Sequence, residues 1–183
     1  MLGLKTMTAE EMENNLGTIA HSGSLAFKNE NEKQDDIDII GQFGVGFYSA
    51  FMVAKKVTVI SRAQGADTAW KWESTGVEGY TLTEADKEDV GTEIILVLKD
   101  DTDTDKYSEY LEDYELANLV KKYSDYIRFP IRMLMPHPKL KEGCPEDKPE
   151  YEEEFVYETL NSMVPLWQRK KSEVTKEEYD KFY

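Results

Sequence analysis

Three glycines within six positions, Gly41, Gly44 and Gly46, form the stretch of this sequence best suited to chemistry. They lead directly into an apolar run, residues 47–54, that is long enough for a buried helix. Glycine has no Cβ, so a ligand can approach its backbone closely, and a helix that begins at such a loop offers unpaired N–H groups to a phosphate. The order G-x-x-G-x-G is neither a Walker loop nor the dinucleotide fingerprint, and short glycine motifs often match by accident. The spacing alone therefore leaves two interpretations open, a phosphate loop or a tight turn that feeds a core helix.

Nucleophiles and soft metal ligands are scarce in this chain. There is one cysteine, Cys144, and there are two histidines, His21 and His137. His137 stands between two prolines, which is typical of a loop. These residues are too few for a structural zinc site and make a Cys/His catalytic pair improbable. A single cysteine also excludes an internal disulfide framework, which fits a reducing compartment.

The charge balance is strongly acidic. The 183-residue chain has a formal net charge of -15, with 40% hydrophobic and 32% charged residues. Nucleic acid and anionic membranes bind basic surfaces, so we expect neither as a partner. The sequence contains no stretch as long as a membrane span and no signal-peptide pattern at its N-terminus. We expect a globular protein of the cytoplasm with one main core.

Local signals place a helix before the glycine-rich stretch. Thr8 and Glu11 form a capping box that satisfies the first-turn N–H groups, and Gly17 is suited to end the helix. From Gly17 to Gly41 the chain is small and hydroxyl-rich and then charged. This segment is either a lid hinged at glycines or an ordinary surface loop.

Beyond residue 54 the hydrophobic period becomes that of strands. Four short segments rich in β-branched and aromatic residues are separated by turn-forming residues, and they cover 57–61, 69–73, 79–83 and 92–98. We expect an antiparallel meander with one face covered by the 46–54 helix and the other partly wet. Later spacing predicts a helix over 116–127 and strands over 128–135 and 155–160. A second capping box, Thr175 with Glu178, predicts a further helix.

The composition shifts at Pro136. Residues 136–154 hold four of the six prolines and an acidic run at Glu150 and 152–154. This composition predicts a solvated linker. The sequence thus predicts a nucleotide-binding domain over 1–135, an acidic, proline-rich linker over 136–154, and the start of another domain over 155–183.

Several longer runs make the chain resemble the ninety-kilodalton heat-shock chaperone family, with bacterial members nearest. The runs are Asn-Asn-Leu-Gly-Thr-Ile-Ala-His-Ser-Gly at 14–23 and Ile-Gly-Gln-Phe-Gly-Val-Gly-Phe-Tyr-Ser at 40–49. Support continues at 91–94, at 122–127 and at 160–167. The similarity covers nearly everything from Met7 onward, and runs of this length are far more specific than the glycine spacing.

The resemblance implies an α+β fold of the GHKL ATPase type, truncated at its N-terminus. This fold is a two-layer α/β sandwich in which helices lie on one face of an antiparallel sheet. ATP, with Mg²⁺, would be held on the helical side under a lid. The resemblance places Asn15 near the base of the lid and Thr92 at the adenine. It places Ser22 and Gly23 beside the ribose and phosphates. The residues around the phosphates would be Gly41, Gln42, Phe43, Gly44, Val45, Gly46 and Phe47.

The family's first third has no counterpart in these 183 residues. In the family that part carries the glutamate that activates water, the asparagine that binds magnesium and the aspartate that reads adenine. Without them, phosphoryl transfer loses its general base and its charge stabilisation. We therefore expect no catalytic residue here, no ATP hydrolysis by this chain alone and at most weak nucleotide binding. We also expect an open sheet edge that pairs with a second copy.

By the same resemblance, the parent protein would be an ATP-dependent molecular chaperone of the heat-shock response. It would bind unfolded client proteins in the cytoplasm and act as a homodimer, and residues 155–183 would begin its middle domain. Two other interpretations stay open. One is another ATPase of the superfamily, of mismatch-repair, gyrase or histidine-kinase type. The other is a non-enzymatic interaction fragment whose acidic surface docks partners.

Overall fold

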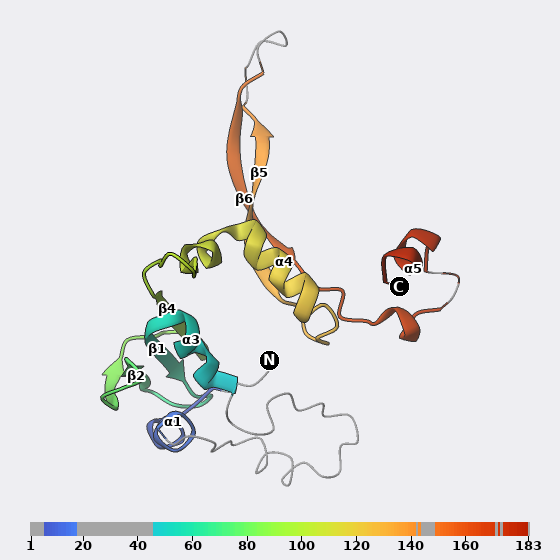
Figure 1. Ribbon diagram of the computed structural model, residues 1–183. Coiled ribbons are helices and arrows are strands. Elements are labelled where there is room, and N and C mark those ends of the chain that lie inside the picture. Colours follow the sequence, from blue (N-terminus) through green and yellow to red (C-terminus); the bar gives the residue numbers. More distant parts are fainter. Residues whose placement is uncertain are drawn as a thin grey trace. The chain divides into compact units, whose positions relative to one another are not determined.

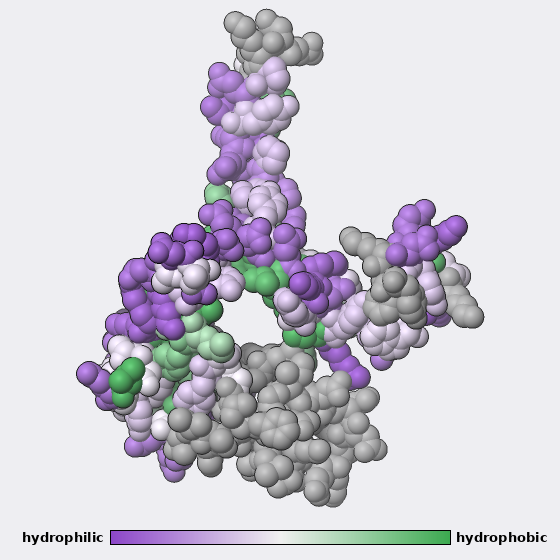
Figure 2. Space-filling model, in the orientation of Figure 1, coloured by the Kyte–Doolittle hydropathy of each residue, from purple (hydrophilic) through white to green (hydrophobic). Residues whose placement is uncertain are grey.

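The computed structural model describes residues 6–17, 46–141, 143, 149–170, 172 and 174–182. The chain divides into two compact units, Met1–Ser108 and Glu109–Tyr183. Figure 1 shows a small sheet with helices in the first unit, and a helix beside a long hairpin in the second. Hydrophilic residues cover most of the visible face, in keeping with the acidic composition (Figure 2). No helix among the described residues is long and apolar enough to cross a membrane.

The first unit contains a four-stranded antiparallel sheet. Its strands are β1 (Ala54–Arg62), β2 (Ala69–Ser74), β3 (Tyr80–Ala85) and β4 (Gly91–Leu98), and their spatial order is β3-β2-β1-β4. All four predicted strands are therefore present and antiparallel. The expectation of a simple meander was wrong, because β4 pairs with β1 on the side away from β2.

The side chain of Arg62 lies at this crossing. Arg62 is the last residue of β1, and its guanidinium donates to the carbonyls of Ala66, Lys87 and Glu88. These bonds anchor the connection between β3 and β4 at the end of β1.

Helix α1 (Ala9–Leu16) begins as predicted. The Thr8 hydroxyl accepts from the Glu11 N–H, and the Glu11 carboxylate accepts from the Thr8 N–H, which completes the capping box. The helix ends at Gly17. Its buried residues join inward-facing side chains of β1 and β2 in one core, which consists of Met7, Met12, Leu16, Ala54, Val57, Val59 and Trp72.

The apolar run after the glycines forms a shorter helical segment than predicted. A 3₁₀ turn, η1 (Gly46–Ser49), leads into α3 (Ala50–Val53), and Ala54 already belongs to β1. None of its residues is fully buried, although Phe47, Ala50 and Phe51 pack against the core. The helix ends early because Ala54 begins to pair with Leu98 of β4.

The second unit contains α4 (Asp113–Tyr123) and a hairpin of β5 (Arg132–Leu140) and β6 (Tyr151–Thr159). It also contains the 3₁₀ turn η3 (Leu166–Gln168) and α5 (Lys176–Phe182), while η2 (Tyr107–Leu111) spans the boundary between the units. The capping box at Thr175 and Glu178 is present, since each N–H donates to the other residue's side chain. Helix α4 ends at Tyr123, so the predicted extension to 127 was wrong.

Most of the described residues in the expected solvated linker, 136–154, belong to strands. Residues 136–140 belong to β5 and residues 151–154 belong to β6. Two lysines neutralise part of the acidic run, because Lys139 of β5 pairs with Glu154 at 2.8 Å and Lys141, just after β5, pairs with Glu150 at 3.1 Å. The prolines at 136 and 138 are two positions apart, so both missing N–H groups fall on the same edge of β5, where the ladder does not need them. The proposed domain limits at 135/136 and 154/155 stay a prediction.

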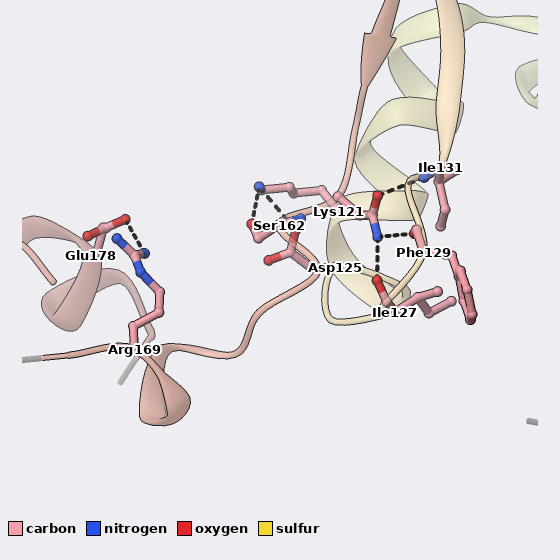
Figure 3. Close-up of polar contacts among 9 residues, drawn as sticks. Lys121, Asp125, Ile127, Phe129, Ile131, Ser162, Arg169 and Glu178 are labelled. Carbon is pink, nitrogen blue, oxygen red and sulfur yellow. Dashed lines mark hydrogen bonds and ion pairs between the residues drawn. The ribbon is translucent and has the colours of Figure 1, made fainter. Parts of the chain in front are cut away.

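Asn161 holds the start of the hairpin to the end of α4. Its side-chain oxygen accepts from the N–H of Ile131, and its amide nitrogen donates to the carbonyls of Ile127 and Phe129 (Figure 3). Nearby, the Asp125 carboxylate accepts from Lys121 and from the N–H and hydroxyl of Ser162. These bonds fix the loop between α4 and β5.

Candidate functional site

Four of the predicted site residues lie in the described part of the chain. Asn15 is half-buried near the end of α1, Gly46 and Phe47 open η1, and Thr92 is the second residue of β4. The other predicted positions lie outside the described residues, and they are Ser22, Gly23, Gly41, Gln42, Phe43, Gly44 and Val45. The lid proposed between Gly17 and Gly41 lies outside them as well.

The half-buried Thr92 pairs with the buried Ser61 through their hydroxyl groups, on the helix-covered face of the sheet. Its Oγ1 lies 2.8 Å from Oγ of Ser61, its cross-strand partner on β1. Ser61 is fully buried, and its Oγ also accepts from the N–H of Met7 at 2.8 Å. Met7 directly precedes the N-cap of α1. The candidate adenine-side residue and the start of α1 therefore share one serine.

The other end of α1 is tied to η1, where the glycine-rich stretch ends. The Tyr48 hydroxyl donates to the carbonyl of Leu16 at 3.0 Å. The Tyr80 hydroxyl donates to the Glu13 carboxylate at 3.3 Å. Because α1 has eight residues, its axis is about 12 Å long. The helix thus spans from the Thr92 side of the sheet to the beginning of η1.

Gly17 allows this close packing at the end of α1. A Cβ on Gly17 would lie 2.8 Å from a ring carbon of Tyr80. The backbone of Gly17 is right-handed, with φ of -81°, so the glycine is needed for space and not for a left-handed turn. The sequence placed the end of the helix correctly, but for a different reason.

Phe47 contributes its ring to the core. The ring contacts Trp72 edge-to-face, with centroids 5.7 Å apart, and Trp72 stacks on Tyr80 at 5.8 Å. Any contact between Phe47 and a phosphate would therefore come from its backbone. Gly46, by contrast, is exposed, and a Cβ there would meet nothing within 4 Å.

The hydroxyl groups of Tyr48 and Tyr80, at the end of α1, both act as hydrogen-bond donors. Burial raises the pKa of the Tyr48 phenol. Burial and then the neighbouring Glu13 carboxylate raise the pKa of the Tyr80 phenol. Both hydroxyls are therefore protonated at neutral pH and keep their hydrogen bonds to α1. Neither provides a general base.

The described residues offer little to a metal ion. Within them, no group of three or more histidine, cysteine, aspartate or glutamate side chains could hold one. Thr92, Asn15 and the start of η1 supply a hydroxyl, an amide and exposed backbone, which are suited to a nucleotide base and to phosphate oxygens.

Sequence reasoning missed Ser61, Tyr48 and Tyr80 as the residues that hold the site together. A signal for Ser61 was present, since it continues the alternation of Val57 and Val59 and so faces the core. The tyrosine contacts had no comparable signal. Tyr80 and Glu13 are 67 positions apart in the sequence.

Comparisons with known proteins show what this chain is similar to. A family model described as histidine kinase-, DNA gyrase B- and HSP90-like ATPase matches residues 5–104. The chain is similar to the chaperone protein HtpG of Alkaliphilus oremlandii, with 58% identity over 97% of this chain and 28% of that protein. The HtpG proteins of Bacillus subtilis and Clostridium acetobutylicum are 57% and 56% identical, with the same two shares. The chain thus spans about a quarter of the length of these relatives.

Proposed function

The chain belongs to the family of histidine kinase-, DNA gyrase B- and HSP90-like ATPases, and on this premise we propose that it is the nucleotide-binding part of an ATP-dependent molecular chaperone. One observation carries the proposal, namely the 56–60% identity to HtpG chaperones over 97% of the chain. The hydroxyl pair of Ser61 and Thr92 supports it, because it fixes the Thr92 hydroxyl on the helix-covered face of the sheet.

We assign the predicted residues to four parts of an ATP site. Thr92 faces the adenine, Asn15 lies at the lid base, and Ser22 with Gly23 lies beside the ribose and phosphates. Backbone N–H groups of residues 41–47 surround the phosphates. In this arrangement α1 sets the distance between the adenine side and the phosphate side, because Ser61 holds its start and Tyr48 holds its end.

Further parts of the proposal concern the longer protein. Mg²⁺ accompanies ATP, the partners are unfolded client proteins, and the parent acts as a cytoplasmic homodimer of the heat-shock response. The domain limits remain those proposed from the sequence, with the nucleotide-binding domain over 1–135, a connecting segment over 136–154 and the start of a middle domain over 155–183. No residue of this chain is assigned a catalytic role.

Two alternatives are less well supported. The family description includes histidine kinases and gyrases, but the relatives described above are HtpG chaperones. The acidic surface also favours a chaperone over the DNA-binding members, since DNA binding requires a basic face. A pure interaction fragment would bind its partners equally well with and without ATP.

A chimera tests the proposal directly. The matching segment of Bacillus subtilis HtpG is replaced by this chain, and ATP binding and hydrolysis are measured with suppression of client aggregation. We expect binding and hydrolysis within about tenfold of the relative, because more than half of the replaced residues are identical. A folded chimera that neither binds nor hydrolyses ATP would contradict the proposal.

Two matched variants of the chimera locate the site. Thr92→Val removes the hydroxyl at nearly constant volume, and we expect about tenfold weaker ATP binding. Thr83→Val makes the same change on the exposed strand β3 and should leave binding unchanged. Equal effects of the two variants on ATP binding would show that Thr92 does not contact the nucleotide.

A further inference from the structure

Thr92, the residue proposed to face the adenine, lies near one end of the β1–β4 ladder. It is the second residue of β4, and its cross-strand partner Ser61 is the last but one of β1. In the register of these two strands one pair lies beyond it, Arg62 with Gly91. The last pairs of a ladder open more readily than the central ones, because fewer neighbours hold them closed. A residue at this position needs a restraint besides the ladder if it is to hold a ligand precisely.

The backbone just before Thr92 supplies little restraint of its own. Gly91 has a φ of +151°, a conformation that residues with a side chain rarely adopt, and glycine has more backbone freedom than any other residue. The connection that precedes it, residues 86–90, is exposed at every position except Lys87, which is half-buried. Burial therefore does little to fix the segment that leads into β4.

The side chain of Arg62 supplies the restraint. Its Nη1 donates to the carbonyl of Glu88 at 2.5 Å and to the carbonyl of Lys87 at 3.3 Å. Its Nε donates to the carbonyl of Ala66 at 3.0 Å. Because the guanidinium is planar and always charged, it can hold several carbonyls in fixed directions at once. One arginine thus ties the turn after β1 to the connection before β4.

Arg62 acts from the face of the sheet opposite to the proposed nucleotide side. Successive residues of a strand point to opposite faces, so the side chains of Ser61 and Arg62 leave β1 in opposite directions. Ser61 holds the Thr92 hydroxyl from the helix-covered face, whereas Arg62 holds the backbone that leads into Thr92. In this arrangement Arg62 acts on a nucleotide through Thr92 and not by contact.

We propose that Arg62 is a positioning residue for nucleotide binding. By holding residues 87 and 88 it keeps the start of β4, residues 91–93, closed on β1, so that the Thr92 hydroxyl stays in place for the adenine. The inference rests on the proposed function and adds to it a residue that lies outside the contacts with ATP. The positioning step itself belongs to the chain alone and can be measured without a nucleotide.

Amide hydrogen exchange of the whole 183-residue chain tests the positioning step. Arg62→Gln replaces the charged fork with a shorter amide that cannot reach three carbonyls. We expect the protection of residues 91–93 to fall at least about tenfold, while that of residues 95–97, in the middle of β4, stays the same. Lys71→Gln is the matched control, because it removes a positive charge from the same face of the adjacent strand β2, and it should change neither.

The chimera with Bacillus subtilis HtpG tests the effect on ATP. Arg62→Gln should raise the KM for ATP about fivefold with kcat nearly unchanged, because an adenine contact acts equally on the ground state and the transition state. Lys71→Gln should leave both constants unchanged. Thr92→Val combined with Arg62→Gln should raise KM no further than Thr92→Val alone, since both changes act through one contact. A general loss of stability would instead lower kcat and add to the effect of Thr92→Val.

Arg62→Lys keeps the charge but not the planar fork, so its effects should fall between those of the wild type and Arg62→Gln. It carries the same measurements if circular dichroism shows that Arg62→Gln is not folded. Unchanged protection of residues 91–93 would overturn the proposal. So would an unchanged KM, or effects that add to those of Thr92→Val, in a chimera that binds ATP. A folded wild-type chimera that binds no ATP contradicts the proposed function itself, so the two failures are distinguished.

Discussion

The hydroxyl oxygens of Ser61 and Thr92 lie 2.8 Å apart across β1 and β4. Ser61 also accepts the backbone N–H of Met7, so three distant segments meet at one buried side chain. A polar group buried without a partner costs free energy, so each member of this cluster stabilises the others. The position of Thr92 is therefore set by the sheet core and not by a loop.

Ser61→Ala should lower the free energy of unfolding by about 1–3 kcal/mol, because it leaves the buried N–H of Met7 without its acceptor. Urea unfolding followed by tryptophan fluorescence measures the loss. Ser172→Ala makes the same chemical change at an exposed serine and should be neutral. Equal losses in the two variants would mean that the Ser61 cluster contributes nothing.

Trp72 is a second point of vulnerability in the first unit. It is 2% exposed, and among the described residues its indole N–H has no hydrogen-bond partner. Trp72→Ala should cost about 3–5 kcal/mol because it leaves a cavity between Phe47 and Tyr80. Trp72→Phe should cost clearly less, since it keeps a ring and removes the unpaired N–H. Urea unfolding monitored by far-ultraviolet circular dichroism, which does not depend on the tryptophan itself, measures both losses. A loss in Trp72→Phe as large as that in Trp72→Ala would contradict this prediction.

Asn161 should be the most sensitive polar residue of the second unit. It is 5% exposed and makes three hydrogen bonds to the backbone of residues 127–131 (Figure 3). Asn161→Ala leaves these backbone groups unpaired and should cost about 3 kcal/mol or more. Asn118→Ala, on the exposed side of α4, should be neutral or slightly stabilising. Hydrogen exchange of the β5–β6 hairpin reports both effects, and unchanged protection in Asn161→Ala would contradict the assignment.

The stability of the second unit should fall in acid because of Asp125. Burial raises the pKa of its carboxyl, but hydrogen bonds from Ser162 and Lys121 outweigh burial and hold the pKa below its usual value. A lowered pKa in the folded state stabilises the protein above the unfolded-state pKa of about 3.9, and this contribution is lost as the pH falls through the folded-state pKa.

The difference in unfolding free energy between wild type and Asp125→Asn should therefore be constant near neutral pH and shrink below about pH 4. Urea unfolding read from the indole NMR signal of Trp167, which packs on Tyr126 in the same unit, measures it. Ser162→Ala removes a donor to Asp125 and should reduce the pH dependence. A difference that stays the same down to pH 2 would show that the Asp125 bonds do not stabilise the fold.

Much of the local structure follows from the sequence alone. The capping boxes at Thr8 and Thr175 and the four strands of the first unit were predicted correctly, because caps and strand periodicity depend on residues a few positions apart. The resemblance to a chaperone family also came from contiguous runs of residues, and the comparisons confirmed it. Composition misled at residues 136–154, because an acidic, proline-rich stretch can pair when lysines lie opposite it.

Only the tertiary structure decided how these elements are joined. Strand β4 pairs with β1 and not with β3, the connection before β4 is anchored by Arg62, and Ser61 reaches Thr92 and Met7 across 31 and 54 positions of sequence. Periodicity shows that a side chain faces the core, but it does not show which side chain will meet it there. Partner choice depends on strand order, and strand order is a property of the whole folded unit.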